Sequence, residues 1–174
     1  MIGMFAAVLA VLSQISIPMP SGVPVTLQTF AVALTGFILG WKYGAISVGI
    51  YILLGTVGVP VFSNFSGGLG ALFGKTGGFI WGFLFLAGFC GVSHITKKKT
   101  VIVLSSALGL LICHLLGDFQ FQIIAGMGFW ESALLVSVPY LLKDAISVFL
   151  AYAVGKVVLK SLRAANIGLC EKRV

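Results

Sequence analysis

A few polar and ionisable side chains interrupt a chain that is otherwise almost entirely apolar. A carboxylate or carboxamide accepts hydrogen bonds from N–H groups, and an ammonium group attracts an anion. Because ionisable groups are costly inside apolar membrane segments, they are functional candidates by default. We therefore predict a site for a small anion that also carries hydrogen-bonding groups. Its candidate residues are Asn64, Lys75, Asp118, Glu131, Lys143 and Asp144.

Two of these residues also have a purely structural interpretation. Glu131 follows Trp130 and is typical of a solvated residue at a membrane edge. Asp118 follows Gly117 at the predicted end of an apolar segment, where it would sit in headgroup water.

Lys143 and Asp144 are neighbours, so on a helix their side chains point about 100° apart. We therefore expect only one of them to face a cavity squarely, while the other snorkels. Asp144 is the stronger candidate because it lies several residues inside an apolar segment, where an unpaired carboxylate is costly. The structural alternative for Asp144 is an ion pair with a lysine of a neighbouring helix, which is compatible with a ligand role.

Catalytic interpretations of the same residues are weaker. The GKT sequence at residues 74–76 resembles the end of a phosphate-binding P-loop, but Leu69 stands where the motif requires glycine. Ser66 and His114 would suit an intramembrane serine hydrolase, in which a base activates a nucleophile. A lone histidine on an apolar helix, however, usually bonds a backbone carbonyl. We expect a protein that is not an enzyme and uses no metal and no cofactor, with the hydrolase kept as an alternative.

The composition indicates an integral membrane protein built from helices. Hydrophobic residues make up 59% of the 174 residues and charged residues only 9%, against about a quarter in soluble domains. The 23 glycines favour closely packed helices, and segments with the strict alternation of a membrane barrel are not visible. We predict one all-α domain over residues 1–174 with six transmembrane helices: 2–17, 25–40, 42–59, 78–96, 100–118 and 140–160. A short helix is expected at 130–138.

Residues 17–30, IPMPSGVPVTLQTF, break the apolar pattern with three prolines. Proline removes a backbone donor and disfavours helix at the preceding residue. Irregular backbone at membrane depth is tolerated only where protein or a water-filled cavity covers it. This segment is therefore predicted to cap or line the site.

Lysine and arginine gather on one side of the predicted spans. With six spans these cations share one face, which the positive-inside rule makes cytoplasmic, so both termini are predicted to be cytoplasmic. The net charge of +7 then reflects topology and anionic lipid, and we predict a lipid bilayer and no nucleic acid as partner. The cations are Lys42, Lys97, Lys98, Lys99, Lys156, Lys160, Arg163, Lys172 and Arg173.

Four stretches in order along the chain resemble the BioY family, the biotin-specific substrate-binding (S) components of energy-coupling-factor (ECF) vitamin transporters. They are IPMPxxVPVTLQTF at 17–30, YILLGTVGVPVFSNFSGG at 51–68, GKTGGF at 74–79 and PYLLKD at 139–144. The resemblance implies a six-helix S-component fold in the plasma membrane that captures biotin on its outer side. An S component for another vitamin is the alternative.

The resemblance also implies roles for individual residues. Asn64 and Asp144 match positions that hydrogen-bond the ureido ring of biotin, and Thr26 and Gln28 are weaker candidates for the same pocket. The family often continues from this aspartate as D-x-x-K, but here the third residue is Ser147. Lys143 or Lys75 is expected to meet the carboxylate of biotin instead. Aromatic walls are expected from Phe62, Phe65, Phe79, Trp81 and Tyr140.

Partners follow from the same resemblance: one transmembrane coupling subunit and two cytosolic ATPases. The small-x-x-x-small pattern of Ala6 and Ala10 on the first helix permits close helix approach. In the family such a motif on this helix is the docking face for the coupling subunit. Ordinary packing inside the bundle is the alternative.

Overall fold

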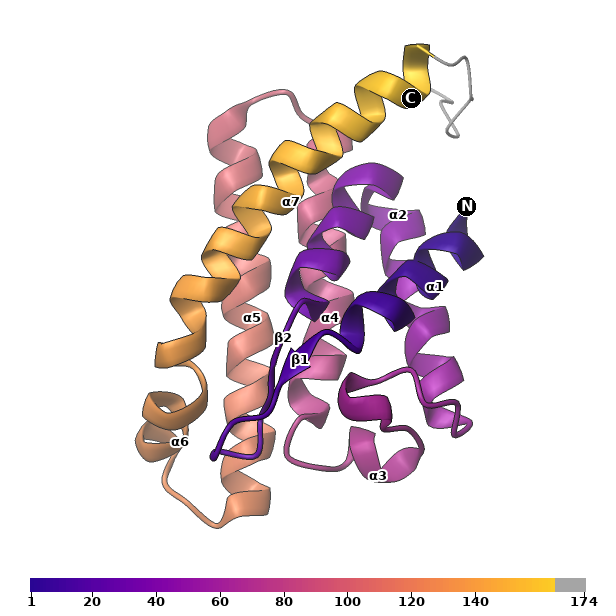
Figure 1. The fold of residues 1–174 in the computed structure, drawn as a ribbon. Helices are drawn as coiled ribbons and strands as arrows, with labels where there is room; N and C mark the ends of the chain where they lie inside the picture. The colour runs from indigo at the N-terminus through magenta and orange to yellow at the C-terminus, as the bar shows by residue number, and fades with distance from the viewer. Residues whose placement is uncertain (165–174) are drawn as a thin grey trace.

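The computed structural model describes residues 1–164, and its chain is mainly helical (Figure 1). The predicted cytoplasmic cations Lys172 and Arg173 lie outside the described residues. In chain order the elements are α1 (Ile2–Ser13), β1 (Ser16–Ile17), β2 (Val25–Thr26), α2 (Gln28–Thr56), the 3-10 helix η1 (Ser63–Phe65), α3 (Leu69–Leu72), α4 (Gly77–Cys90), the 3-10 helix η2 (Gly91–His94), α5 (Lys99–Ala125), α6 (Phe129–Val136) and α7 (Val138–Ala164).

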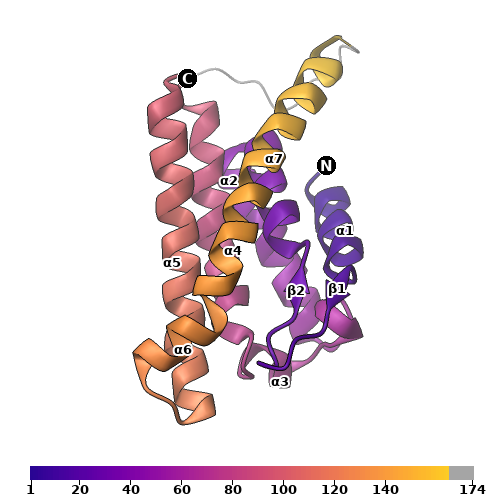
Figure 2. The same ribbon diagram turned by 60° about the vertical axis from the view of Figure 1, so that its left-hand side comes forward.

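Helix α2 is two antiparallel arms that reverse at Gly40. Gly40 has a φ of 80° and a ψ of 175°, a conformation that L side chains rarely adopt. The side chains of Gln28 and Tyr51 hydrogen-bond at 2.8 Å although they are 23 residues apart, whereas a straight helix would separate them by about 35 Å. The arms, residues 28–39 and 41–56, correspond to the second and third predicted spans (Figures 1 and 2).

Among residues 1–164, four helical segments are long and apolar enough to cross a membrane, with both arms of α2 counted as one segment, so the chain is a multi-pass membrane protein. They are Gln28–Thr56, Gly77–His94, Lys99–Ala125 and Val138–Leu162. The apolar helix Ile2–Ser13 is shorter. Helical structure runs on to Ala125, past the predicted end of the fifth span at residue 118. Asp118 is therefore inside a helix and 3% exposed, and the prediction that it sits in headgroup water is wrong.

The proline segment forms a small hairpin outside the helices. Strands β1 and β2 are antiparallel, with Ser16 opposite Thr26 and Ile17 opposite Val25. The three prolines at 18, 20 and 24 stand outside the helices, as predicted from their missing donors. The hairpin turn, α3 and α6 gather at one end of the bundle, whereas the start of α1 and the last turns of α7 lie toward the other end (Figure 1). The predicted short helix at 130–138 is confirmed as α6.

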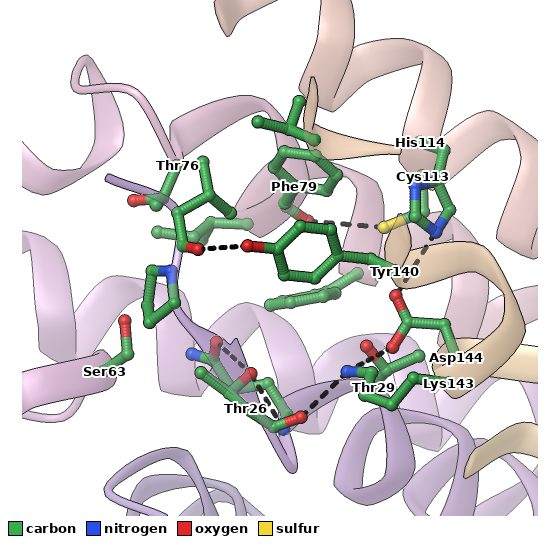
Figure 3. Close-up of a pocket in the computed structure, with 16 residues that line it drawn as sticks. Thr26, Thr29, Ser63, Thr76, Phe79, Cys113, His114, Tyr140, Lys143 and Asp144 are labelled. Atoms are coloured by element: carbon green, nitrogen blue, oxygen red, sulfur yellow. Dashed lines mark hydrogen bonds and ion pairs between the residues drawn. The ribbon is translucent and has the colours of Figure 1, made fainter. Parts of the chain in front are cut away.

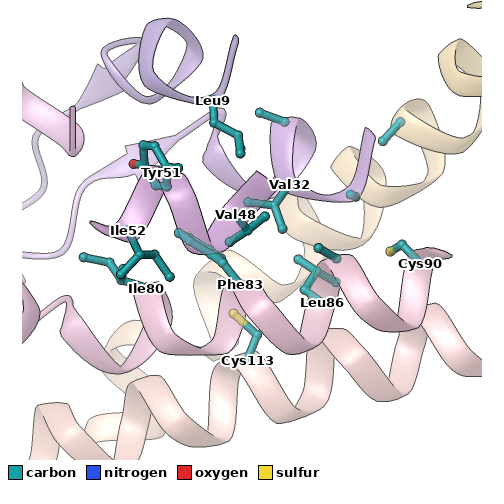
Figure 4. Close-up of a cluster of buried hydrophobic side chains, with 14 of the residues drawn as sticks. Leu9, Val32, Val48, Tyr51, Ile52, Ile80, Phe83, Leu86, Cys90 and Cys113 are labelled. Carbon is teal, nitrogen blue, oxygen red and sulfur yellow. The ribbon is translucent and has the colours of Figure 1, made fainter. Parts of the chain in front are cut away.

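Helix α4 packs between α2 and α5 through close contacts at glycines. An added Cβ on Gly36 of α2 would lie 2.3 Å from the carbonyl oxygen of Ala87, and one on Gly82 would lie 2.6 Å from Cα of Cys113. Small residues let helices approach this closely in lipid. Buried side chains of α1, α2, α4 and α5, including Leu9, fill the spaces between the backbones (Figure 4). This tight core holds the helix ends that surround the site.

Candidate functional site

A small pocket with an internal volume of about 50 Å³, partly open to solvent, lies among the hairpin, α2, α4, α5 and α7 (Figure 3). Apolar and polar side chains share its walls, as in small-molecule sites. The lining residues are Val23, Pro24, Thr26, Gln28, Thr29, Ser63, Thr76, Phe79, Ile80, Phe83, Cys113, His114, Val136, Tyr140, Lys143 and Asp144.

Lys143 and Asp144 both line the pocket and form an ion pair with each other. Lys143 Nζ also donates to the backbone oxygen of Thr26 at 2.9 Å. The lysine side chain is 30% exposed, and that of Asp144 is 9% exposed. The prediction that only one of the two could face the cavity is wrong, because the flexible lysine stem curls back over its neighbour. The ammonium group joins α7 to the hairpin across the pocket (Figure 3).

His114 of α5 links Asp144 to a second buried carboxylate. Its Nε2 lies 3.2 Å from Asp144 Oδ2, and its Nδ1 lies 2.9 Å from the hydroxyl of Ser137. That hydroxyl donates to Asp118 Oδ1 at 2.6 Å. The expectation that His114 bonds a backbone carbonyl is therefore wrong. The ionisable neighbour of Asp144 on another helix is this histidine, while its lysine partner is the adjacent Lys143.

Thr26 of β2 and Gln28 at the start of α2, the two weaker candidates from the family resemblance, line the pocket. The Thr26 hydroxyl donates to Gln28 Oε1 at 3.1 Å, and Gln28 Nε2 donates to the hydroxyl of Tyr51 at 2.8 Å. Both side chains are buried. The second arm of α2 thus fixes the amide before any ligand arrives.

Asn64 and Lys75 lie beside the pocket and are not among its lining residues. Asn64 is exposed, has a φ of 56°, and accepts a hydrogen bond from the hydroxyl of Ser16 at 2.7 Å. Lys75 is exposed and lies against Gly22 of the hairpin turn. The chain neighbours Ser63 and Thr76 do line the pocket, so the two predicted residues stand at its rim.

Of the five aromatic candidates, Phe79 and Tyr140 line the pocket. The hydroxyl of Tyr140 donates to the backbone oxygen of Val23 at 2.7 Å and so ties α7 to the hairpin. Phe62 is buried against the ring of Tyr51. The other two, Phe65 and Trp81, are 72% and 41% exposed.

The residues of the hydrolase alternative have other partners. Ser66 is exposed and its hydroxyl donates to the backbone oxygen of Ser63, while the ring of His114 is engaged by Ser137 and Asp144. Ser137, His114 and Asp144 have the residue types of a catalytic triad. The hydroxyl of Ser137 donates to Asp118, however, and Ser137 is not among the lining residues. A free nucleophile facing the pocket is missing from this constellation.

Sequence reasoning did not join Asp118, His114 and Ser137 into one group. A signal was present, because His114 and Asp118 are four residues apart and so share one face of α5. Ser137 gave no such signal, since it precedes α7 and reaches the group only through the fold.

The two alanines predicted for docking point toward the bundle itself. Ala6 is 2% exposed and belongs to the core, and Ala10 is half-buried against it. The exposed positions on α1 include Gly3, Ala7 and Val11. A partner that packs on α1 in this conformation would therefore meet a different face from the predicted one.

Comparison with known proteins shows the family of the chain. The BioY family model matches residues 1–164. A biotin transporter BioY from Thermotoga maritima is 44% identical over 118 residues, 67% of this chain and 69% of that protein. A probable biotin transporter BioY from Pyrococcus horikoshii is 34% identical over 156 residues, 90% of this chain and 92% of that protein.

A solved structure has the same fold. It is the crystal structure of the S-component for biotin from an ECF-type ABC transporter, with a TM-score of 0.79 and 24% sequence identity over 91% of this chain and 88% of that chain. The match of the family model over all described residues, with relatives aligned along most of the chain, is decisive. The chain belongs to the BioY family.

Proposed function

We propose that this chain binds biotin for uptake, as the membrane-embedded specificity subunit of an ECF-type transporter. The observation that carries the proposal is the ion pair of half-buried Lys143 with buried Asp144 on the wall of the pocket, which Thr26 and Gln28 also line. Membership of a family whose relatives are named biotin transporters supports the ligand. Those relatives are transport proteins, and the function is not enzymatic.

The ureido ring of biotin is chemically matched to this wall. It offers two N–H donors and one carbonyl acceptor. Asp144 accepts from an N–H group, and the ammonium of Lys143 donates to the carbonyl, because it has three donors and uses two of them on Asp144 and Thr26. The buried amide of Gln28 completes a polar patch that rejects analogues without these groups. Phe79 and Tyr140 cover the apolar ring.

The carboxylate of biotin then points to the rim, where Lys75 is the second cation. Lys143 is held beside Asp144 and is better placed for the ureido end. Lys75 lies between Gly22 and the lining residue Thr76, so its long stem can reach a carboxylate at the mouth. We assign the carboxylate to Lys75, although Lys143 was an equal candidate from the sequence.

Calorimetric titration of purified protein with biotin and with biotin methyl ester tests the binding function and this assignment together. We expect biotin to bind and the ester to bind about fivefold more weakly, because an ion pair at a half-open rim contributes on the order of 1 kcal/mol. Lys75→Met should remove this difference. Lys143→Met should weaken both ligands and keep the difference.

Absence of biotin binding to monodisperse protein would refute the function. Equal affinity of wild-type protein for acid and ester would refute the lysine assignment alone. The affinity difference between acid and ester could instead disappear in Lys143→Met and persist in Lys75→Met. In that case Lys143, and not Lys75, would contact the carboxylate.

Asn64 stays a proposed contact to the ureido ring. In this structure its amide oxygen is bound to Ser16, so a direct role requires that the η1 segment turn toward the pocket when ligand binds. We expect Asn64→Ala to weaken biotin about tenfold, the worth of one buried hydrogen bond, in the same titration. Ser66→Ala, in the same exposed loop, is the matched control and should bind as wild type does. Unchanged affinity of the Asn64→Ala variant for biotin would show that Asn64 does not contact the ureido ring.

The same proposal covers topology and partners. We propose one plasma-membrane domain over residues 1–174, in which α1, the two arms of α2, α4, α5 and α7 are the six membrane segments and both termini are cytoplasmic. The pocket end then faces outward. One transmembrane coupling subunit and two cytosolic ATPases drive release of biotin inside. For docking, Ala6 and Ala10 require rotation of α1, whereas Gly3 and Ala7 are exposed already.

An S component for another vitamin remains the second candidate, because the fold alone does not select the ligand. Competition separates the two. An excess of other water-soluble vitamins should leave bound radiolabelled biotin in place. Displacement by one of them at a lower concentration than that of unlabelled biotin would show that the site prefers that vitamin.

A further inference from the structure

Behind the pocket, four side chains contact one another in turn and form a polar network with a carboxylate at each end. Asp118 Oδ1 lies 2.6 Å from the Ser137 hydroxyl, which lies 2.9 Å from His114 Nδ1, and His114 Nε2 lies 3.2 Å from Asp144 Oδ2. All four residues are less than 9% exposed. This network joins α5, the α6–α7 connection and α7.

The number of protons in this network decides whether Nε2 of His114 donates or accepts a hydrogen bond. Three contacts between two carboxylates need three protons, whereas a serine and a neutral imidazole supply one each. One further proton is therefore required, either on the ring or on Asp118. Asp144 acts as an acceptor because the ammonium of Lys143 lies on its other oxygen. Under either placement of the extra proton, Nε2 carries a proton and donates it to Asp144.

Charge balance favours the same arrangement. With the extra proton in the network, the charges of Lys143, His114, Asp118 and Asp144 sum to zero, and without it they sum to −1. A net charge buried among apolar helices is costly. The extra proton removes this cost and leaves each of the three contacts with a donor.

We propose that His114 is a positioning residue for ligand binding: its Nε2–H holds the Asp144 carboxylate in place, while Ser137 and Asp118 fix the ring from behind. The inference rests on the proposed role of Asp144 toward the ureido ring. A carboxylate held on both oxygens, by Lys143 and by His114, meets its ligand in one orientation and loses little freedom on binding. The ring of Phe79, edge-on at 5.7 Å between centroids, confines the imidazole from the α4 side.

Two conservative variants separate positioning from packing. In His114→Gln the side-chain amide reaches the place of Nε2 and can still donate to Asp144. In His114→Asn the amide reaches only the place of Nδ1, so it keeps the Ser137 contact and loses Asp144. We expect His114→Gln to bind biotin within about threefold of wild type and His114→Asn about 10- to 100-fold more weakly, the range for a hydrogen bond to a charged group. Ser137→Ala should lie between them.

Equal affinities of the two variants would overturn the positioning role, because a packing role does not distinguish the two amides. Failure of wild type to bind biotin at all would instead overturn the proposed function. A measurement on wild-type protein covers the case in which the variants do not fold. The chain has two histidines, so ¹⁵N-imidazole spectra show two rings, which His94→Gln assigns. A proton on Nε2 of His114 is the expected result, and an unprotonated Nε2 would refute the inference.

Discussion

Asp144→Asn should lower the affinity for biotin at least about a hundredfold. The change keeps the shape of the side chain but replaces an anion by an amide, which turns N–H donors toward Lys143, His114 and the ureido N–H groups. Removing one partner of a buried charge pair costs about 3–5 kcal/mol, and Asp144 is the common partner of Lys143 and His114. Calorimetric titration in detergent measures the loss.

Glu131→Gln is the matched control, because it makes the same chemical change at an exposed carboxylate. Glu131 accepts a hydrogen bond from the backbone nitrogen of Gly128 at 3.2 Å, and it does not line the pocket. The affinity of the Glu131→Gln variant for biotin should match that of wild-type protein. If Asp144→Asn bound biotin within threefold of wild type while remaining monodisperse, Asp144 would not contact the ureido ring.

Gly78→Ala should lower the thermal midpoint of the protein more than any of the pocket variants. A Cβ at Gly78 would lie 2.0 Å from the backbone oxygen of Leu116 and 2.9 Å from Cα of Gly117. Both atoms belong to the backbone of α5, so no side-chain rotation relieves the overlap and the two helices must move apart. Overpacking of this kind costs about 1–3 kcal/mol or more. Thermal unfolding of detergent-solubilised protein measures the effect.

Gly88→Ala is the control on the same helix. A Cβ at Gly88 meets nothing within 4 Å, and alanine is the better helix former by about 1 kcal/mol. Its midpoint should equal or exceed that of wild type. Equal midpoints for the two variants would show that α4 and α5 are not as close as in this structure.

Much of the architecture follows from local properties of the sequence. The membrane class and the positions of the long helices depend on hydropathy summed over about twenty residues, which tertiary contacts do not alter. The prolines at 18, 20 and 24 interrupt the helices because proline lacks a donor whatever surrounds it. The break at Gly40 falls where the second and third predicted spans were separated, since glycine adopts a positive φ more readily than other residues.

The site could be predicted only in part. Thr26, Gln28, Lys143 and Asp144, which the sequence named as candidates, line the pocket, and their contact with a ligand stays a prediction. The sequence did not predict that Lys143 folds back onto Asp144, because that contact depends on the rotamer of a flexible stem and on the carbonyl of Thr26, 117 residues away.

Residue types, apolar windows and the family motifs were thus settled by the sequence itself, because each depends on local chemistry. Only the tertiary structure decided that Ser137 joins His114 to Asp118, that Ala6 faces inward, and that Asn64 and Lys75 stand at the rim. These outcomes depend on the rotation of each helix about its axis and on which neighbour fills the space beside it. Periodicity identifies the face of a helix, but only packing determines what that face meets.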